Sequence, residues 1–116
     1  MGAIHEKSMA FAIRIVNLYK YLCTNRSEYI LSKQLLRSGT SIGANVSESV
    51  YAQSRSDFNS KMYIALKEAG ESEYWLELLE RTEYLTAAQA KSIRDDCQEL
   101  IKILSSITKT TKERKG

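Results

Sequence analysis

QLLRSGTSIGANVSE, residues 34 to 48, spaces its apolar residues as a helix does but is crowded with small ones. Six small residues fall between positions 38 and 44, and two of them, Gly39 and Gly43, are glycines. Glycine inside a helix costs about 0.5–1 kcal/mol relative to alanine. We therefore expect another backbone to approach this helix closely, which favours tight packing inside a bundle of helices.

The helical spacing extends to four segments of the chain. Apolar residues recur three and four positions apart over residues 8–23, 28–53 and 57–85, and again from Thr86 to Ile107. Short connections between long helices favour antiparallel neighbours. We predict an all-α fold in which one domain, residues 1–108, forms an up-down-up-down antiparallel four-helix bundle.

Polar residues at the breaks between these segments are typical of helix starts. A side-chain oxygen at such a position accepts a hydrogen bond from a free backbone N–H of the first turn. The residues expected to cap the second, third and fourth helices are Asn25 or Ser27, Ser54 or Ser56, and Thr86 with Gln89.

The composition narrows the class of protein. The 116 residues include no proline, as an all-helical chain requires, and no apolar run long enough to span a membrane. The start of the chain lacks the apolar segment of a signal peptide, so we expect a cytoplasmic protein. Cys23 and Cys97 favour two buried thiols over a disulfide or a metal site, and His5 is the only histidine. We expect no cofactor and no metal.

The positive charge is concentrated at the C-terminal end. Of residues 109–116, Lys109, Lys112, Arg114 and Lys115 are basic and only Glu113 is acidic, whereas the rest of the chain has 13 basic and 13 acidic residues. We expect residues 109–116 to form a flexible basic tail. Such a tail either only solvates the chain end or contacts RNA or an acidic partner.

A polar stripe runs beside the small residues. The second predicted helix carries Arg37, Ser41, Asn45 and Glu48 on one face, and the third offers carboxylates. If these faces meet, the network fixes helix register or a subunit contact; a ligand site and a catalytic cluster are the alternatives. The acidic candidates on the third helix include Glu68 and Glu71.

Aromatic side chains are numerous for a small bundle. Seven tyrosines and Trp75 cannot all fit one core. Exposed tyrosine and tryptophan are enriched at protein interfaces, and they also stack on unpaired bases. Because arginine and lysine do not alternate closely with these rings, we favour an interface between subunits.

Two signatures resemble a known family. RSGTSIGANVSES, residues 37–49, is similar to the pattern arginine-x-x-x-Ser-Ile-x-x-Asn-x-x-Glu of the proteins named for intervening sequences of bacterial 23S ribosomal RNA. KMYIALKEAGESEYWLELL, residues 61–79, preceded by Asp57 and Phe58, resembles a common form of that family's third helix. The positions that match the two signatures are Arg37, Ser41, Ile42, Asn45 and Glu48, and Glu68, Glu71, Trp75 and Leu76.

The resemblance implies a cytoplasmic, ribosomal protein S23-like bundle that assembles as a homopentamer and is not an enzyme. A related branch, the accessory variability proteins of retroelements, binds reverse transcriptase and RNA through a basic surface. The neutral body of this chain departs from that branch. Ser49 also stands where glycine is common in the family, so the second helix is expected to run on.

These observations lead to one functional hypothesis and one alternative. The hypothesis is a non-enzymatic homo-oligomeric adaptor that contacts RNA or a nucleoprotein partner, with Lys109, Lys112, Arg114 and Lys115 as the RNA-binding residues. The alternative is a protein-interaction module with no nucleic-acid role. No small-molecule substrate or membrane contact is expected.

Overall fold

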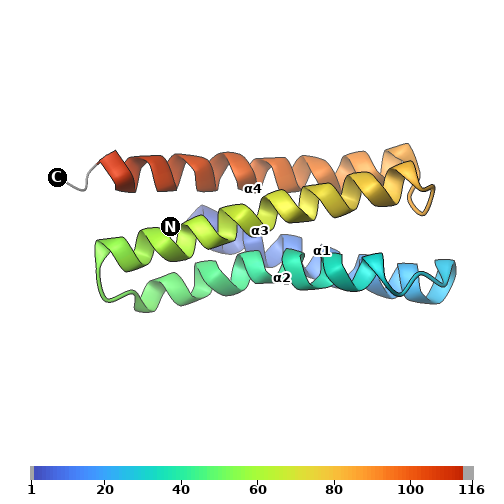
Figure 1. The fold of residues 1–116 in the computed structure, drawn as a ribbon, viewed down its shortest axis with the longest axis horizontal. Helices are drawn as coiled ribbons and strands as arrows, with labels where there is room; N and C mark the ends of the chain where they lie inside the picture. The colour runs from blue at the N-terminus through green and yellow to red at the C-terminus, as the bar shows by residue number, and fades with distance from the viewer. Residues whose placement is uncertain (1, 114–116) are drawn as a thin grey trace.

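Four α-helices follow one another with no strand among residues 2–113, the part of the chain that the computed structural model describes. Successive helices run in alternate directions along a body of 50 × 22 × 21 Å, and both chain ends lie toward the same end of it (Figure 1). The prediction of an all-α chain with four helices is confirmed. The helices are α1 (Gly2–Arg26), α2 (Leu31–Glu48), α3 (Arg55–Arg81) and α4 (Ala87–Glu113), with a short 3-10 helix, η1 (Ser49–Tyr51), after α2.

The core is built from the apolar stripes of all four helices. Phe11 and Ile15 of α1, Ile42 of α2, Leu76 of α3 and Leu104 of α4 are each no more than 1% exposed. Burying one such side chain contributes about 1.5–3 kcal/mol. The remaining fully buried large side chains continue these stripes: Ile4, Leu22, Leu35, Val46, Met62, Leu79 and Leu100.

The small residues of α2 face two different neighbours. A Cβ added at Gly43 would lie 3.4 Å from the backbone oxygen of Ser8, so here the expected close approach of a backbone is present. At Gly39 the neighbour is a side chain instead, because an added Cβ would lie 2.8 Å from Ile15 Cγ1. The glycines thus allow α1 to approach α2.

The expected caps of α2 are wrong. Ser27 adopts a φ of 52°, the left-handed conformation that ends α1. The carboxylate of Glu28, only 7% exposed, takes the capping role and accepts hydrogen bonds from the N–H groups of Ile30, Leu31 and Ser32 at 3.1, 2.9 and 2.7 Å. An ionised acceptor makes stronger hydrogen bonds than the neutral Asn and Ser side chains that we expected.

The caps of α3 and α4 were predicted correctly. The Ser54 hydroxyl accepts from the N–H of Asp57 at 3.0 Å. Thr86 and Gln89 bond reciprocally, with each side-chain oxygen accepting from the other residue's backbone N–H at 3.1 and 2.9 Å. Both pairs satisfy donors that a helix start otherwise leaves free.

Helix lengths differ from expectation. Segment 28–53 ends as an α-helix at Glu48 and tightens into η1, and α3 ends four residues before the predicted position 85. At the N-terminal end, α1 begins at Gly2 rather than at residue 8, because Ile4 is buried against the core. Boundaries of this kind depend on tertiary burial that spacing alone does not report.

The flexible tail that we expected over residues 109–116 is helical as far as Glu113. Thr108 is buried and donates to the oxygen of Leu104 at 3.0 Å, and Thr111 donates to Ile107 at 2.8 Å. Both hydroxyl groups donate to backbone oxygens of their own helix, so the polar residues of this segment do not interrupt α4. Residues 114–116 lie outside the described part of the chain.

Candidate functional site

Arg37 of α2 lies between two carboxylates of α3. Its guanidinium donates to Glu68 Oε1 at 3.2 Å and to Glu71 Oε2. The indole N–H of Trp75 donates to the same Glu71 oxygen at 2.9 Å. The structure therefore brings together four of the residues singled out from the sequence, across the α2–α3 seam.

The electrostatics of this cluster favour the charged forms. The hydrogen bond from Arg37, and then that from Trp75, lower the pKa of Glu71 below its ordinary value. The bond to Glu71 raises the pKa of Arg37. The Arg37 side chain is 49% exposed, however, and partly exposed ion pairs contribute little to stability. The cluster links α2 to α3 at the surface of the bundle.

Ser41, Asn45 and Glu48 do not join this cluster. Ser41 donates to the backbone oxygen of Arg37 at 2.6 Å, and the Asn45 amide donates to that of Ser41 at 2.9 Å. Such bonds to the carbonyl four residues earlier are common for polar side chains inside helices. Glu48 pairs with Lys61 at 3.0 Å. The network that we expected to span the whole stripe is thus two separate ion-pair groups.

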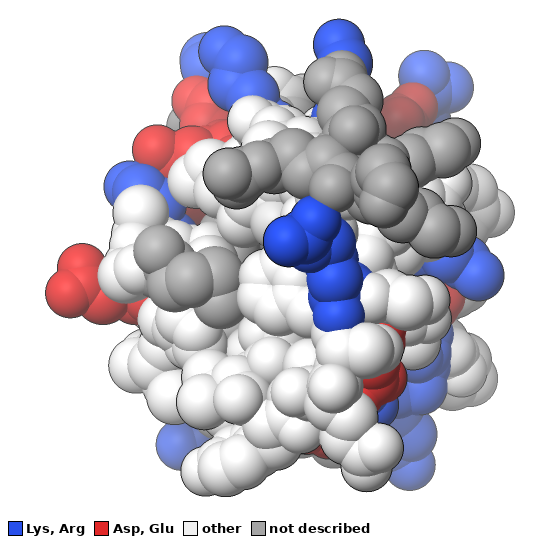
Figure 2. Space-filling model, turned by 90° about the vertical axis from the view of Figure 1, so that its left-hand side faces the viewer, with Lys and Arg blue, Asp and Glu red and all other residues white. Residues whose placement is uncertain are grey.

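Lys109 and Lys112 lie near the C-terminal end of α4. Lys109 is exposed on α4, and Lys112 lies within the last turn of the same helix. Arg114 and Lys115 fall outside the described residues. Figure 2 looks onto this end and shows lysine and arginine side chains around its edge, with acidic side chains beside several of them and a broad uncharged surface between.

Tyrosines contribute much of the exposed apolar surface. The most exposed of them are Tyr51, Tyr74, Tyr29 and Tyr63, at 82%, 59%, 58% and 54%. Trp75, in contrast, is partly buried and packs against the core. The exposed rings come from three parts of the chain: Tyr29 precedes α2, Tyr51 lies on η1, and Tyr63 and Tyr74 lie on α3.

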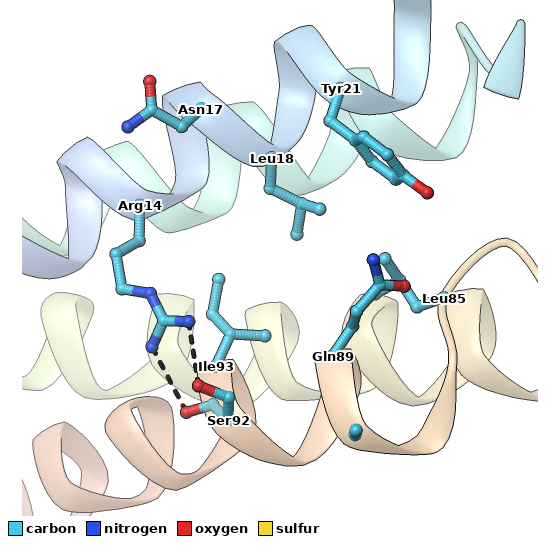
Figure 3. Close-up of a pocket in the computed structure, with 9 residues that line it drawn as sticks. Arg14, Asn17, Leu18, Tyr21, Leu85, Gln89, Ser92 and Ile93 are labelled. Atoms are coloured by element: carbon cyan, nitrogen blue, oxygen red, sulfur yellow. Dashed lines mark hydrogen bonds between the residues drawn. The ribbon is translucent and has the colours of Figure 1, made fainter. Parts of the chain in front are cut away.

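One feature was missed by sequence reasoning, a groove between α1 and α4. These two helices form the loosest of the seams between neighbours, and a hollow of about 580 Å³ opens there. Leu18 and Ile93 point into it, and Tyr21 lies beside it (Figure 3). Arg14 closes one end by bonding Asp96 at 2.7 Å and Ser92 at 3.0 Å. The feature of the sequence that could have indicated this groove is Arg14, a charged residue within an otherwise apolar stretch of α1.

The reactive and metal-binding residue types form no site among residues 2–113. No group of three His, Cys, Asp or Glu side chains in this range could hold a metal ion. Both cysteines are free, and Cys97 donates to the oxygen of Ala69 at 3.2 Å. Burial raises the pKa of Cys97 to about 12, so its thiol stays protonated. None of the described helices is both long and apolar enough to cross a bilayer.

Comparisons with known proteins agree with the fold. The model of the family described as 23S rRNA-intervening sequence protein matches residues 3–106. A protein of unknown function from the S23 ribosomal protein family of Bacteroides thetaiotaomicron, solved as a crystal structure at 1.70 Å, is 59% identical with a TM-score of 0.90. The match covers 91% of this chain and 98% of that one. No curated protein matches the sequence.

Proposed function

This chain belongs to the 23S rRNA-intervening sequence protein family, and from that premise we propose that it is a non-enzymatic homo-oligomeric adaptor contacting RNA or a nucleoprotein partner. The assembly proposed is the pentamer that the resemblance of the two signatures implies. The proposed setting is the cytoplasm, in keeping with the S23 ribosomal description of the solved relative.

The observation that carries the RNA contact is the position of the basic residues. Lys109 is exposed on the last turns of α4, and three more basic residues follow it in sequence. The rest of the chain has equal numbers of acidic and basic residues and offers a polyanion little net attraction. Any electrostatic contact with RNA is therefore expected at this end of the bundle.

Assembly would multiply this weak site. One subunit carries four basic residues in this segment and can neutralise about four phosphates, which gives log Kobs against log salt a slope near −3 on single strands. Five copies held in one assembly raise the effective concentration of each remaining site once the first has bound. Avidity then supplies the affinity that a single segment lacks.

The test replaces charge without shortening α4. In a K109Q/K112Q/R114Q/K115Q variant, RNA binding measured by fluorescence anisotropy should fall at least about tenfold, and its salt slope should flatten. The control, R81Q/K91Q, removes two exposed charges from the opposite end of the bundle and should bind as the parent does. Unchanged binding by the first variant would refute the proposed site.

The alternative is a protein-interaction module with no nucleic-acid role. The exposed apolar side chains favour it, in particular Tyr51 and Ile30, at 82% and 75% exposed. Affinity purification from the native host followed by sequencing of bound RNA distinguishes the two. One stoichiometric protein partner without RNA would support the alternative.

A further inference from the structure

Two helices on opposite sides of the bundle expose apolar side chains. On α1, Met9 and Ile13 are 63% and 55% exposed. On α3, Tyr63 and Tyr74 are 54% and 59% exposed, and Ile64 is 40% exposed. Because α1 and α3 are diagonal in the bundle, each packed on α2 and α4, these two faces point away from each other (Figure 1).

No close contact among the described residues requires a glycine at position 70. It lies in the middle of α3 and is exposed, and a Cβ added there would have no neighbour within 4 Å among residues 2–113. Gly39 and Gly43, by contrast, have close neighbours on α1. Gly70 lies seven residues after Tyr63 and four before Tyr74, hence on the same helix face. It forms a notch between two aromatic side chains.

The two exposed faces match in height along the bundle. Ile15 packs against the position of Gly39, and the adjacent Ser38 lies 2.8 Å from Ser72 of α3. Ile15 and Ser72 are therefore at about the same level, and α1 and α3 run in the same direction (Figure 1). Ile13 lies two residues before Ile15, and Gly70 lies two residues before Ser72. The exposed side chain of Ile13 is therefore at the same level along the bundle as the notch at Gly70.

One pair of opposite charges on the two faces lies at the same height along the bundle. Lys20 lies five residues after Ile15 on α1, and Glu77 lies five residues after Ser72 on α3, so the two charges are level with each other. Toward the other end, Glu6 of α1 lies within about one turn of the level of Lys67 on α3. The faces thus carry one level pair of opposite charges, Lys20 and Glu77, and a second pair offset by about one turn. Glu77 also pairs with Arg81 of its own helix at 2.8 Å.

We propose that copies of this chain pack side by side, α1 of one against α3 of the next, with Ile13 seated over Gly70 between Tyr63 and Tyr74. Rotation about an axis parallel to the bundles keeps every residue at its height, so it brings the level positions together. Two different faces in contact form a heterologous interface, which closes into a ring when the rotation between neighbours allows it and otherwise grows as an open array. This contact presupposes the proposed homo-oligomer and specifies the two surfaces that form it.

The test uses one variant for each face. I13D places a charge on the α1 face, and G70L fills the notch on α3; both positions are exposed, and circular dichroism checks that the bundle still folds. Each variant alone should weaken self-association by about thirtyfold or more, as measured by sedimentation velocity. The control, V50D, changes an exposed valine on η1, outside both faces, and should keep the parent mass.

Mixing the two variants tests the head-to-tail geometry. I13D retains an intact α3 face, and G70L retains an intact α1 face, so the mixture should form one-to-one dimers that grow no further. If the parent forms an oligomer and both variants have the same mass as the parent, the proposed contact is wrong, whereas the proposed assembly is still supported. A parent that stays monomeric would overturn the assembly and the contact together.

Discussion

The hydroxyl groups of Ser38 and Ser72 lie 2.8 Å apart in the buried seam between α2 and α3. Both side chains are fully buried, and Ser72 also lies 2.9 Å from the backbone oxygen of Glu68. Small hydroxyl side chains therefore let these helices approach while their polar atoms remain satisfied.

Replacing Ser72 should separate the polar contribution from the steric one. S72A removes the hydroxyl pair and should lower the free energy of unfolding by about 0.5–1.5 kcal/mol. S72L also overpacks the seam and should cost about 1–3 kcal/mol more. Urea denaturation followed by circular dichroism measures both, and equal losses would show that the seam tolerates volume.

Gly39 and Gly43 should respond differently to alanine. G39A gains helix propensity but forces Ile15, a fully buried side chain, to move, so we expect a net loss of about 1–2 kcal/mol of unfolding free energy. G43A meets a backbone oxygen at 3.4 Å and should lose less. Thermal denaturation of the pair tests this order; a more stable G39A would contradict the observed packing.

The carboxylate of Glu28 should make stability depend on pH. Burial raises its pKa, but the N–H groups of Leu31, Ser32 and Ile30 outweigh burial, and the pKa lies below its ordinary value. Its contribution is therefore present above the unfolded pKa, about 4.3, and is lost as pH falls through the folded pKa.

The variant E28Q tests this contribution. At pH 7 it should lower the free energy of unfolding by about 1–2 kcal/mol, the range for losing a helix cap. Near pH 3 the difference from the parent should shrink. E83Q, which makes the same substitution at an exposed glutamate on the α3–α4 connection, is the matched control.

The fluorescence of Trp75 should report the ionisation of Glu71. It is the only tryptophan, and its indole N–H donates to Glu71 Oε2 at 2.9 Å. Because Arg37 and Trp75 lower the pKa of Glu71, the fluorescence should change at a pH below the ordinary glutamate value of about 4.3. E71Q should abolish that transition, whereas E73Q should retain it. A transition that persists in E71Q would assign it to another group.

Sequence reasoning found much of the α2–α3 cluster and misjudged its extent. Spacing by three and four residues placed Arg37 on a polar stripe of its own helix, because helical periodicity is a local property. It offered Glu71 of the third helix as a partner only if the two faces meet. It did not indicate that Asn45 bonds its own helix, since a side chain chooses between a neighbouring helix and its own backbone only once the helices are packed. Glu28 was missed as a cap because it precedes its helix by three residues.

The amino-acid sequence by itself determined the four helices, their order, the caps of α3 and α4, and the small residues that let α1 and α3 close on α2. Periodicity and turn chemistry act over a few residues, so no packing was needed to see them. Only the tertiary structure decided that α4 continues to Glu113, that the α1–α4 seam leaves a groove, and that Gly70 has no close neighbour among the described residues. Those features depend on which surfaces the packed helices cover, and burial is a property of the whole arrangement rather than of any one helix.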